Sequence, residues 1–218
     1  MRKRKADKII AKLREDYNSV ATSFSRSKNI LWTELEFLFR YAEKGEKVLD
    51  VGCGNGRFSR YLEETEYLGL DFSENLITEA KKLFPQKRFL LGNALSLPFE
   101  DSSFDKVYAI ALIHHIPLEE YRVKALQEMY RVLKPGGMVF LTAWKRKRKG
   151  LRWSQVLRFF SFSDVSITFN GRERYYHLFK EQELSEIAEK AGFVVMEEGV
   201  VKRKKFGNFY LIARKEVV

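Results

Sequence analysis

The chain has 218 residues, a length that suits one domain with a full-sized core better than two small ones. Apolar residues make up 45% of the sequence, which argues against extensive disorder, and no apolar run approaches the ~20 residues that a helix needs to cross a bilayer. The formal charge is +11 and Cys53 is the single cysteine, so we expect a cytoplasmic protein without disulfides and with an affinity for polyanions.

Residues 1–45 are predicted to form an N-terminal helical cap. Apolar residues from Leu35 to Ala42 follow the i, i+3, i+4, i+7 spacing of a buried helix face, and Gly45 ends that helix. The basic start, Met1–Lys5, is followed by no apolar segment of the kind that a secretory signal contains, so we expect no such signal.

From residue 47 onward, strand-like apolar runs alternate with helical patterns. Strands are predicted at 48–51, 67–70, 89–91, 105–112, 138–143, 193–201 and 208–213, and helices at about 56–63, 73–83, 123–133 and 181–191. This alternation predicts an α/β, Rossmann-like fold with seven strands in a mostly parallel sheet, and the short last connection predicts a C-terminal antiparallel hairpin. Residues 145–178 lack clear periodicity for the most part and are interpreted as an insertion into this single domain.

A glycine-rich turn, Asp50-Val51-Gly52-Cys53-Gly54-Asn55-Gly56, joins the first predicted strand to a helix. Its glycines allow a ligand to approach the backbone, and a helix start offers free N–H groups. Dinucleotide enzymes share this arrangement, but their fingerprint requires a glycine at the position of Arg57. The leading acid, Asp50, would repel a pyrophosphate. The loop therefore favours a nucleotide-like ligand that carries an ammonium and a sulfonium group.

Further candidate ligand-binding residues follow the next predicted strands. Asp71 lies 19 residues after Gly52, the spacing of one strand–helix–strand step, and can accept hydrogen bonds from both hydroxyls of a ribose. Asn93 offers an amide to an adenine edge, and Phe72 offers a ring to the base. Ala94 and Ala111, at the ends of the third and fourth predicted strands, are the remaining candidate ligand-binding residues.

Three segments of the chain together resemble a known family. Val48–Gly56, Leu70–Ser73 and Arg131–Gly137 look like the successive motifs of class I S-adenosylmethionine-dependent methyltransferases, over roughly residues 47–144. The resemblance implies that S-adenosyl-L-methionine is the cofactor and that the glycine loop, Asp71 and Asn93 bind it.

A narrower resemblance extends over most of the chain. It joins four segments to the tRNA methyltransferases that esterify 5-carboxymethyluridine at the wobble position: Tyr17–Trp32, Ile110–His115, Arg174–Phe179 and Asn208–Lys215. The chain departs from that family at Asn93-Ala94, where Asp-Ala is usual, at Leu31, which replaces a proline, and after Trp144. The resemblance implies a tRNA substrate and, for some members, a small zinc-containing activator protein.

The excess positive charge is concentrated in three runs without an acid, Arg2–Lys5, Lys145–Lys149 and Lys202–Lys205. The last two leave the carboxyl ends of predicted strands, which is the edge where ligands of open α/β sheets bind. We therefore predict that these two runs bind the RNA backbone. Their residues are Lys145, Arg146, Lys147, Arg148, Lys149, Lys202, Arg203, Lys204 and Lys205. Nearby aromatic residues, among them Trp144, Trp153 and Tyr176, could either stack an unpaired base or fill the core of the insertion.

The predicted chemistry is an in-line transfer of a methyl group, which depends mainly on proximity and orientation. A carboxylate acceptor is already anionic and needs no general base. The candidate catalytic or positioning residues are Lys28, His114, His115, Arg174 and His177. We expect no metal site, because no metal-ligand spacing is present in the sequence, and no nucleophilic role for Cys53, which has no recognisable base partner.

Two other functions remain open at this point. A small-molecule methyltransferase of the same fold would act on a quinone or a metabolite carboxylate, and its basic runs would be incidental. A non-catalytic RNA-binding protein would keep the fold as a scaffold, although the intact acids and glycines of the loop argue against it.

Overall fold

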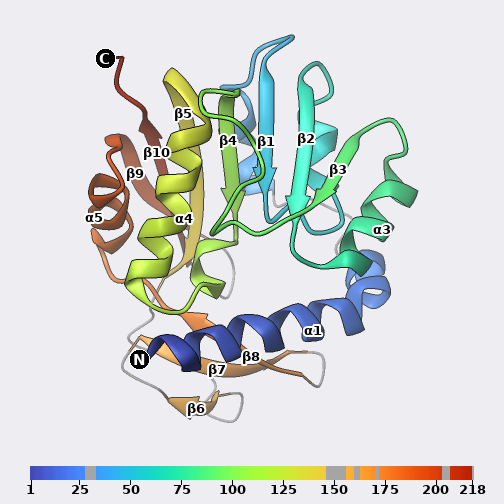
Figure 1. Cartoon of the computed structure of the whole chain (residues 1–218), viewed down its shortest axis with the longest axis vertical. Coiled ribbons are helices and arrows are strands. Elements are labelled where there is room, and N and C mark those ends of the chain that lie inside the picture. Colours follow the sequence, from blue (N-terminus) through green and yellow to red (C-terminus); the bar gives the residue numbers. More distant parts are fainter. Residues whose placement is uncertain (28–32, 146–155, 160–162, 170–171, 203–206, 218) are drawn as a thin grey trace.

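The computed structural model describes residues 1–27, 33–145, 156–159, 163–169, 172–202 and 207–217. Its centre is a seven-stranded sheet in the order β3-β2-β1-β4-β5-β10-β9 (Figure 1). The first five strands are parallel, and β10 is antiparallel to both β5 and β9. The predicted Rossmann-like sheet and C-terminal hairpin are therefore confirmed. The strands are β1 (Lys47–Val51), β2 (Glu66–Asp71), β3 (Arg88–Leu91), β4 (Phe104–Ile110), β5 (Leu133–Trp144), β9 (Val194–Lys202) and β10 (Gly207–Arg214).

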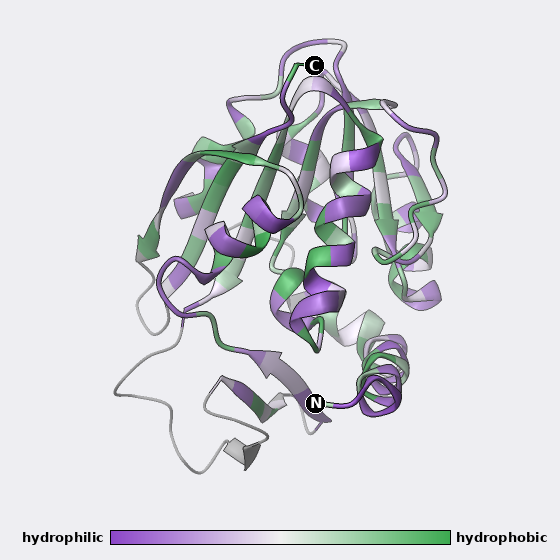
Figure 2. Ribbon diagram, turned by 60° about the vertical axis from the view of Figure 1, so that its left-hand side comes forward, coloured by the Kyte–Doolittle hydropathy of each residue, from purple (hydrophilic) through white to green (hydrophobic). Residues whose placement is uncertain are grey.

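Helices cover both faces of this sheet, because its central strands are apolar on both sides. Val107 of β4 faces one core, whereas the next residue, Tyr108, faces the other. Figure 2 shows mostly hydrophobic colours along the central strands and mixed colours on the helices. One face carries α4 (Glu119–Val132) and α5 (Glu183–Lys190), and the other carries η1 (Thr33–Leu35), α2 (Glu36–Phe39), η2 (Arg57–Tyr61) and α3 (Glu74–Leu83).

Several predicted elements differ in detail. The helix predicted to end at Gly45 is the short η1 and α2, and α2 already ends at Phe39, with Arg40 as its C-cap. The segment after the glycine loop is a short 3-10 helix and not an α-helix, because its turns close between residues three apart, as in the hydrogen bond from Ser59 N–H to the Gly56 carbonyl at 3.0 Å. Strand β5 begins at Leu133, five residues earlier than predicted, because Leu133 already pairs with Phe104 of β4. Ser73 caps the start of α3, since its hydroxyl accepts a hydrogen bond from Leu76 N–H.

The N-terminal region contains a long helix, α1 (Lys3–Ser27), which lies across the carboxyl ends of the parallel strands (Figure 1). Its apolar face is buried at Ala6, Leu13 and Val20, and the helix packs against α3 and β8. In the described part of the chain, no helix is long and apolar enough to cross a membrane.

The predicted insertion contains a second, smaller sheet of three antiparallel strands, β6 (Val156–Phe159), β7 (Asp164–Phe169) and β8 (Arg172–His177). Periodicity could not reveal β8, because Arg174, Tyr175, Tyr176 and His177 are all buried although most of them are polar. The Tyr176 ring stacks on Trp144, at the end of β5, with centroids 4.4 Å apart, so this sheet is attached to the carboxyl edge of the main one.

Candidate functional site

The glycine loop lies at the carboxyl end of β1 and is held against β2. All three loop glycines have positive φ, and the N–H groups of Gly52 and Cys53 both donate to the Leu70 carbonyl, at 2.7 and 3.1 Å. A side chain at Gly52 would lie 2.9 Å from Leu112, and one at Gly56 would lie 2.6 Å from Phe89. At Gly54, in contrast, the nearest atom would be a Phe24 ring carbon 3.8 Å away. Gly54 is therefore the position where a ligand can approach the backbone.

We expect Gly56→Ala to destabilise the fold much more than Gly45→Ala, although both glycines have φ between 76° and 79°. The left-handed backbone costs an alanine roughly 1–2 kcal/mol at either position. Only at Gly56 would the new methyl group also overlap a buried ring, that of Phe89, which adds about 1–3 kcal/mol. Urea unfolding measures both losses, and equal losses would contradict this packing of the loop.

Asp71, at the end of β2, connects the loop to the second strand. Its Oδ2 accepts a hydrogen bond from Gly54 N–H and its Oδ1 accepts one from Ser73 N–H, both at 2.9 Å. Burial raises the pKa of Asp71 to about 6, against the lowering effect of the backbone hydrogen bonds. Each carboxylate oxygen keeps a lone pair for a further donor, such as a ligand hydroxyl.

Asp50 lies beneath the loop and is fully buried. Its Oδ2 accepts a hydrogen bond from the Tyr67 hydroxyl at 2.8 Å, while its Oδ1 has no hydrogen-bond partner among the described residues. Burial raises the pKa of Asp50 to about 7, although the hydrogen bond from Tyr67 lowers it. Asp50 is therefore bonded to the neighbouring strand β2 through one oxygen, and its other oxygen is left for a ligand or a water molecule.

The raised pKa of Asp50 predicts a stability that falls as pH rises. Between its unfolded value near 3.8 and about 7, the folded state binds the proton more tightly than the unfolded chain does, so ionisation costs stability over that range. Replacing Asp50 with Asn removes this cost. Between pH 4 and pH 8 the unfolding free energy of the variant should therefore rise, relative to that of the native chain, by a few kcal/mol.

Asp105 provides the matched control for this measurement. Burial opposes ionisation there too, but hydrogen bonds from Lys134 and from the Lys47 amide lower the pKa of Asp105 below its usual value. Its contribution to stability is therefore lost as pH falls, and the pH dependence of Asp105→Asn should have the opposite sign. If urea unfolding gives the same sign for both variants, the assignment of Asp50 is wrong.

The remaining candidate cofactor-binding residues, which we call the donor side because the cofactor would donate the methyl group, lie at the ends of β2, β3 and β4. Phe72 is half-buried, with its ring 6.2 Å from that of Tyr17. Asn93 is exposed, and its Oδ1 accepts a hydrogen bond from Leu95 N–H within the same turn, where Ala94 lies between them. Ala111 has a positive φ of 59°, a conformation that is rare outside glycine and typical of functional sites, and its N–H donates to the Thr142 hydroxyl.

A compact aromatic group, which we call the aromatic cluster, lies beside this loop. It consists of His114, His115, Trp144, Tyr176 and Tyr17, contributed by η3 (Ile113–His115), β5, β8 and α1. The rings of His114 and Tyr176 are nearly parallel, 5.8 Å apart. Tyr17 contacts both Phe72 on the donor side and His115 in the cluster, so the two sets of residues adjoin each other.

His115 is held as a neutral imidazole. The Tyr175 carbonyl, 3.2 Å from Nδ1, can only accept a hydrogen bond, so Nδ1 carries the proton and Nε2 accepts one from the Tyr17 hydroxyl at 2.9 Å. Burial lowers the pKa of His115 to about 4, with a further lowering by the charge of Arg174. Burial also lowers the pKa of His114. Neither ring is a cation near neutral pH.

Arg174 of β8 places a buried positive charge at the cluster. Only 2% of the residue is exposed, and its guanidinium carbon lies 4.4 Å from the centre of the Tyr17 ring. His177, from the same strand, has a different environment. Its Nδ1 lies 2.7 Å from Asp164 and its Nε2 lies 2.5 Å from Glu183, so it connects β8, β7 and α5.

The two predicted RNA-binding runs fall mostly outside the described residues, as does Lys28. Residues 146–149 and 203–205 belong to this group, while Lys145 is described and the backbone of Lys202 is described. Lys145 forms an ion pair with Glu181 at 3.0 Å, and its N–H donates to the Gly207 carbonyl. Because Gly207 pairs with Lys202 in the hairpin, the chain leaves for both runs from the same corner of the sheet.

Sequence reasoning did not identify Tyr17 or Thr142 as site residues. Tyr17 lies on the apolar stripe of α1 between Leu13 and Val20, where its spacing is that of a core residue. Thr142 is an unexceptional residue of a buried strand until its contact with Ala111 is seen. No local pattern distinguishes either position.

Comparison with known proteins agrees with this geometry. A family model described as a methyltransferase domain matches residues 49–141. A putative methyltransferase of Encephalitozoon cuniculi is 34% identical over 194 residues, which covers 87% of this chain and 90% of the relative. The tRNA (carboxymethyluridine(34)-5-O)-methyltransferase of Schizosaccharomyces pombe is 28% identical over 221 residues and covers 91% and 94% of the two chains.

Solved structures share the fold. A Burkholderia thailandensis 1,6-didemethyltoxoflavin-N1-methyltransferase with bound S-adenosylhomocysteine superposes with a TM-score of 0.74 at 19% identity, over 96% of this chain and 90% of that one. A putative methyltransferase in complex with the Trm112 activator of Haloferax volcanii superposes with a TM-score of 0.68 at 18% identity, over 92% and 97%.

The sheet order, the glycine loop at the end of β1 and the acid at the end of β2 define a nucleotide-cofactor-binding α/β enzyme. Together with the matches of sequence, they show that the chain belongs to the class I S-adenosylmethionine-dependent methyltransferases. S-adenosylmethionine is its methyl donor. The residues fit this cofactor, because Gly54 leaves its side open and the Asp71 carboxylate has unused lone pairs beside it.

Proposed function

We propose that this methyltransferase acts on tRNA and forms a methyl ester on the carboxymethyl group of a wobble-position uridine. One observation carries the proposal, namely the buried guanidinium of Arg174 within a cluster of aromatic rings that adjoins the donor loop. A guanidinium matches a carboxylate, and aromatic rings match an unstacked base. The similarity to the Schizosaccharomyces pombe enzyme supports the same substrate.

On the donor side, we assign Asp71 to the ribose hydroxyls, Asn93 to the adenine edge and Phe72 to the face of the base. Gly54, where an added side chain would meet nothing closer than 3.8 Å, leaves the loop backbone open to the ligand. When bound, the cofactor supplies an electrophilic methyl group on a sulfonium. The chain has to hold the acceptor in line with it, and proximity of this kind is worth several orders of magnitude in rate.

On the acceptor side, Arg174 positions the carboxylate and Tyr176 or Trp144 stacks the uracil ring. The carboxylate is anionic at neutral pH, so no proton has to be removed, and the neutral state of His115 agrees with a role in shaping the pocket through Tyr17. We assign His177 to holding β8, and with it Arg174, in place through Asp164 and Glu183.

We further propose that the two basic runs at the corner formed by Lys145 and Gly207 bind the tRNA backbone. This corner is at the end of β5, next to Trp144 of the aromatic cluster. A small activator protein is a proposed partner, supported by the Haloferax volcanii complex of the same fold. We propose the cytoplasm as the compartment of this reaction.

The proposal is tested with labelled S-adenosylmethionine, the full chain and tRNA from cells that lack wobble methyl esters, with and without an added activator. Mass spectrometry of the nucleosides should show methyl-esterified carboxymethyluridine, sensitive to mild alkali. Asp71→Ala serves as the control with weakened donor binding. Methylation of a metabolite carboxylate or quinone with no tRNA product would overturn the proposal.

A further inference from the structure

Helix α1 has a polar face that neither the core nor the donor site uses. Its cations lie at Arg4, Lys5, Lys8, Lys12 and Arg26, and its hydroxyls at Ser19, Thr22 and Ser23. At 100° per residue these positions fall on one side of the helix, and all are exposed. Glu15 lies among them, and Lys12 is paired at 2.6 Å with the buried Asp16 at the edge of that side. We call this face the α1 polar stripe. At 1.5 Å per residue it is roughly 33 Å long, enough for several successive phosphates of a nucleic acid.

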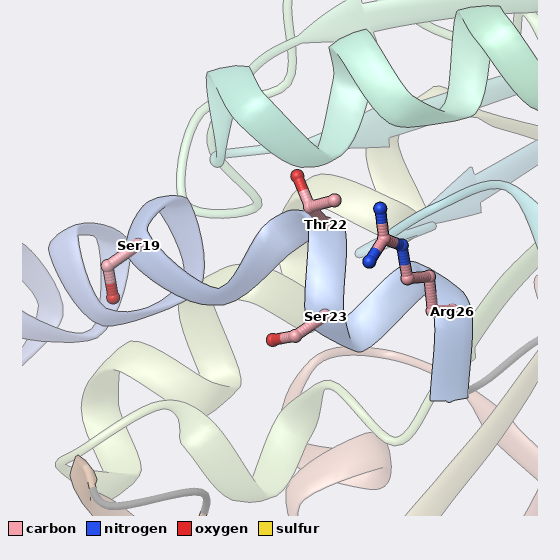
Figure 3. A pocket seen from close by; sticks show the side chains of 4 residues that line it. All are labelled: Ser19, Thr22, Ser23 and Arg26. Carbon is pink, nitrogen blue, oxygen red and sulfur yellow. The ribbon is translucent and has the colours of Figure 1, made fainter.

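A hollow in the surface lies at the C-terminal half of the stripe. It is lined by Ser19, Thr22, Ser23 and Arg26, which follow the i, i+3, i+4, i+7 spacing. In Figure 3 the Arg26 side chain extends back along the helix in the direction of Thr22. The hydroxyls of Ser19 and Ser23 donate to the carbonyls of Asp16 and Val20, at 2.8 and 2.9 Å, so their oxygens are left as acceptors on the outside.

We infer that the α1 polar stripe is a binding surface for the RNA backbone. Arg26, Lys8 and Arg4 supply the charges that phosphates need, and the Thr22 hydroxyl supplies a neutral donor. The Ser19 and Ser23 oxygens are placed to accept hydrogen bonds from ribose 2′-hydroxyls, which DNA lacks. The inference rests on the proposed RNA substrate and adds where its backbone is held.

The position of α1 relates this surface to the acceptor site. The opposite side of the same helix carries Tyr17, whose hydroxyl contacts His115 and whose ring contacts Phe72. The stripe is therefore about one helix diameter, ~10 Å, from the aromatic cluster. A distance of this size is comparable to that between the phosphate and the far edge of the base in one unstacked nucleotide. A nucleotide whose phosphate lies on the stripe could therefore reach the aromatic cluster with its base.

An anionic membrane is the other polyanion that a basic helix could bind, and the packing disfavours it. A membrane-surface helix inserts its apolar face into the lipid. In this protein the apolar face of α1 is already buried, with Ala6, Leu13 and Val20 between 0% and 8% exposed. The charges of Arg4, Lys8 and Arg26 are exposed, and these suit a backbone of phosphates that lies along the helix.

The test measures the affinity of the full chain for bulk tRNA and for a single-stranded RNA oligomer over a range of salt concentrations. Changing Lys8 and Arg26 to Gln should reduce the slope of log affinity against log salt by roughly 1.4 for the oligomer, about 0.7 for each lost phosphate contact. The matched control changes Lys44 and Arg88 to Gln, two exposed cations at the opposite edge of the sheet, and should leave the slope unchanged. Donor affinity should stay the same in both variants.

A second variant tests the hydroxyls. Ser19→Ala with Ser23→Ala should keep the salt slope but reduce the preference for RNA over DNA of the same sequence by several-fold. An unchanged slope in the Lys8/Arg26 variant, or equal losses in the control, would overturn the inference while the proposed tRNA activity could still be measured. Binding to phosphatidylserine vesicles without RNA binding would also overturn it. Reduced slopes in a protein that methylates no tRNA would instead support the surface and refute the proposed function.

Discussion

Replacing Asp71 with alanine is expected to weaken the binding of S-adenosylmethionine by about 100-fold. The Asp71 carboxylate is assigned to two ribose hydroxyls, and each hydrogen bond to a charged group contributes on the order of 1.5 kcal/mol. The same carboxylate also orders the loop through Gly54 N–H and the next helix through Ser73 N–H. Isothermal titration of the donor measures the effect directly, without a need for the methyl acceptor.

Asn18→Ala is the control that distinguishes a direct contact between Asp71 and the cofactor from an indirect effect of loosening the turn after β2. The Asn18 side chain on α1 accepts hydrogen bonds from the Ser73 hydroxyl and the Asn75 amide, so it supports the same turn as Asp71 without facing the donor loop. Its loss should change donor affinity by no more than a few-fold. If Asp71→Ala binds the donor as tightly as the native chain, or if both variants lose affinity equally, the ribose assignment fails.

Replacing Arg174 with methionine is expected to reduce kcat/KM for tRNA by about 100-fold and to leave donor affinity within twofold. A hydrogen-bonded charge pair with the acceptor carboxylate is worth about 3 kcal/mol, and methionine keeps the apolar stem while it removes the charge. The salt dependence of tRNA binding should stay the same, because the guanidinium is buried and is assigned to the acceptor carboxylate and not to a phosphate. Arg174→Lys keeps the charge and should restore part of the activity.

Arg172→Met is the matched control on the same strand. Arg172 is exposed, and among the described residues its guanidinium forms a long ion pair with Asp16, at 3.7 Å, so its loss should change kcat/KM less than threefold. Thermal unfolding of all three variants identifies any that fail to fold. If Arg174→Met does not fold, the activity of Arg174→Lys is compared with that of the native chain instead. A loss of donor affinity in Arg174→Met, or equal losses of turnover in both methionine variants, would refute the acceptor assignment.

The donor side of the site was predictable because its residues are close in sequence to the strands that present them. Gly52, Gly54 and Gly56 are separated by fixed steps, and Asp71 follows one strand–helix–strand unit later. Parallel strands end at the same edge, so local order alone brings these residues together. The sequence did not predict the hydrogen bond that one Asp50 oxygen accepts from Tyr67, because no sequence pattern indicates this contact.

The proposed acceptor side depends on contacts between segments far apart in the chain. Tyr17 meets His115 across 98 residues, and Trp144 meets Tyr176 across a segment with no readable period. Aromatic residues in such a segment are equally suited to a core and to a binding surface, so composition could name Trp144 and Tyr176 but could not place them.

The sequence by itself determined the seven-stranded α/β architecture, the glycine loop and the identity of the methyl donor, because periodicity and short-range spacing encode them. Only the tertiary structure showed that α1 lies across the carboxyl edge, that a second sheet holds Arg174 beside Tyr17, and that the ends of both basic runs meet at Gly207. These arrangements come from burying side chains against distant partners. A sequence pattern indicates which side chains can be buried, but it does not indicate which distant residues they contact.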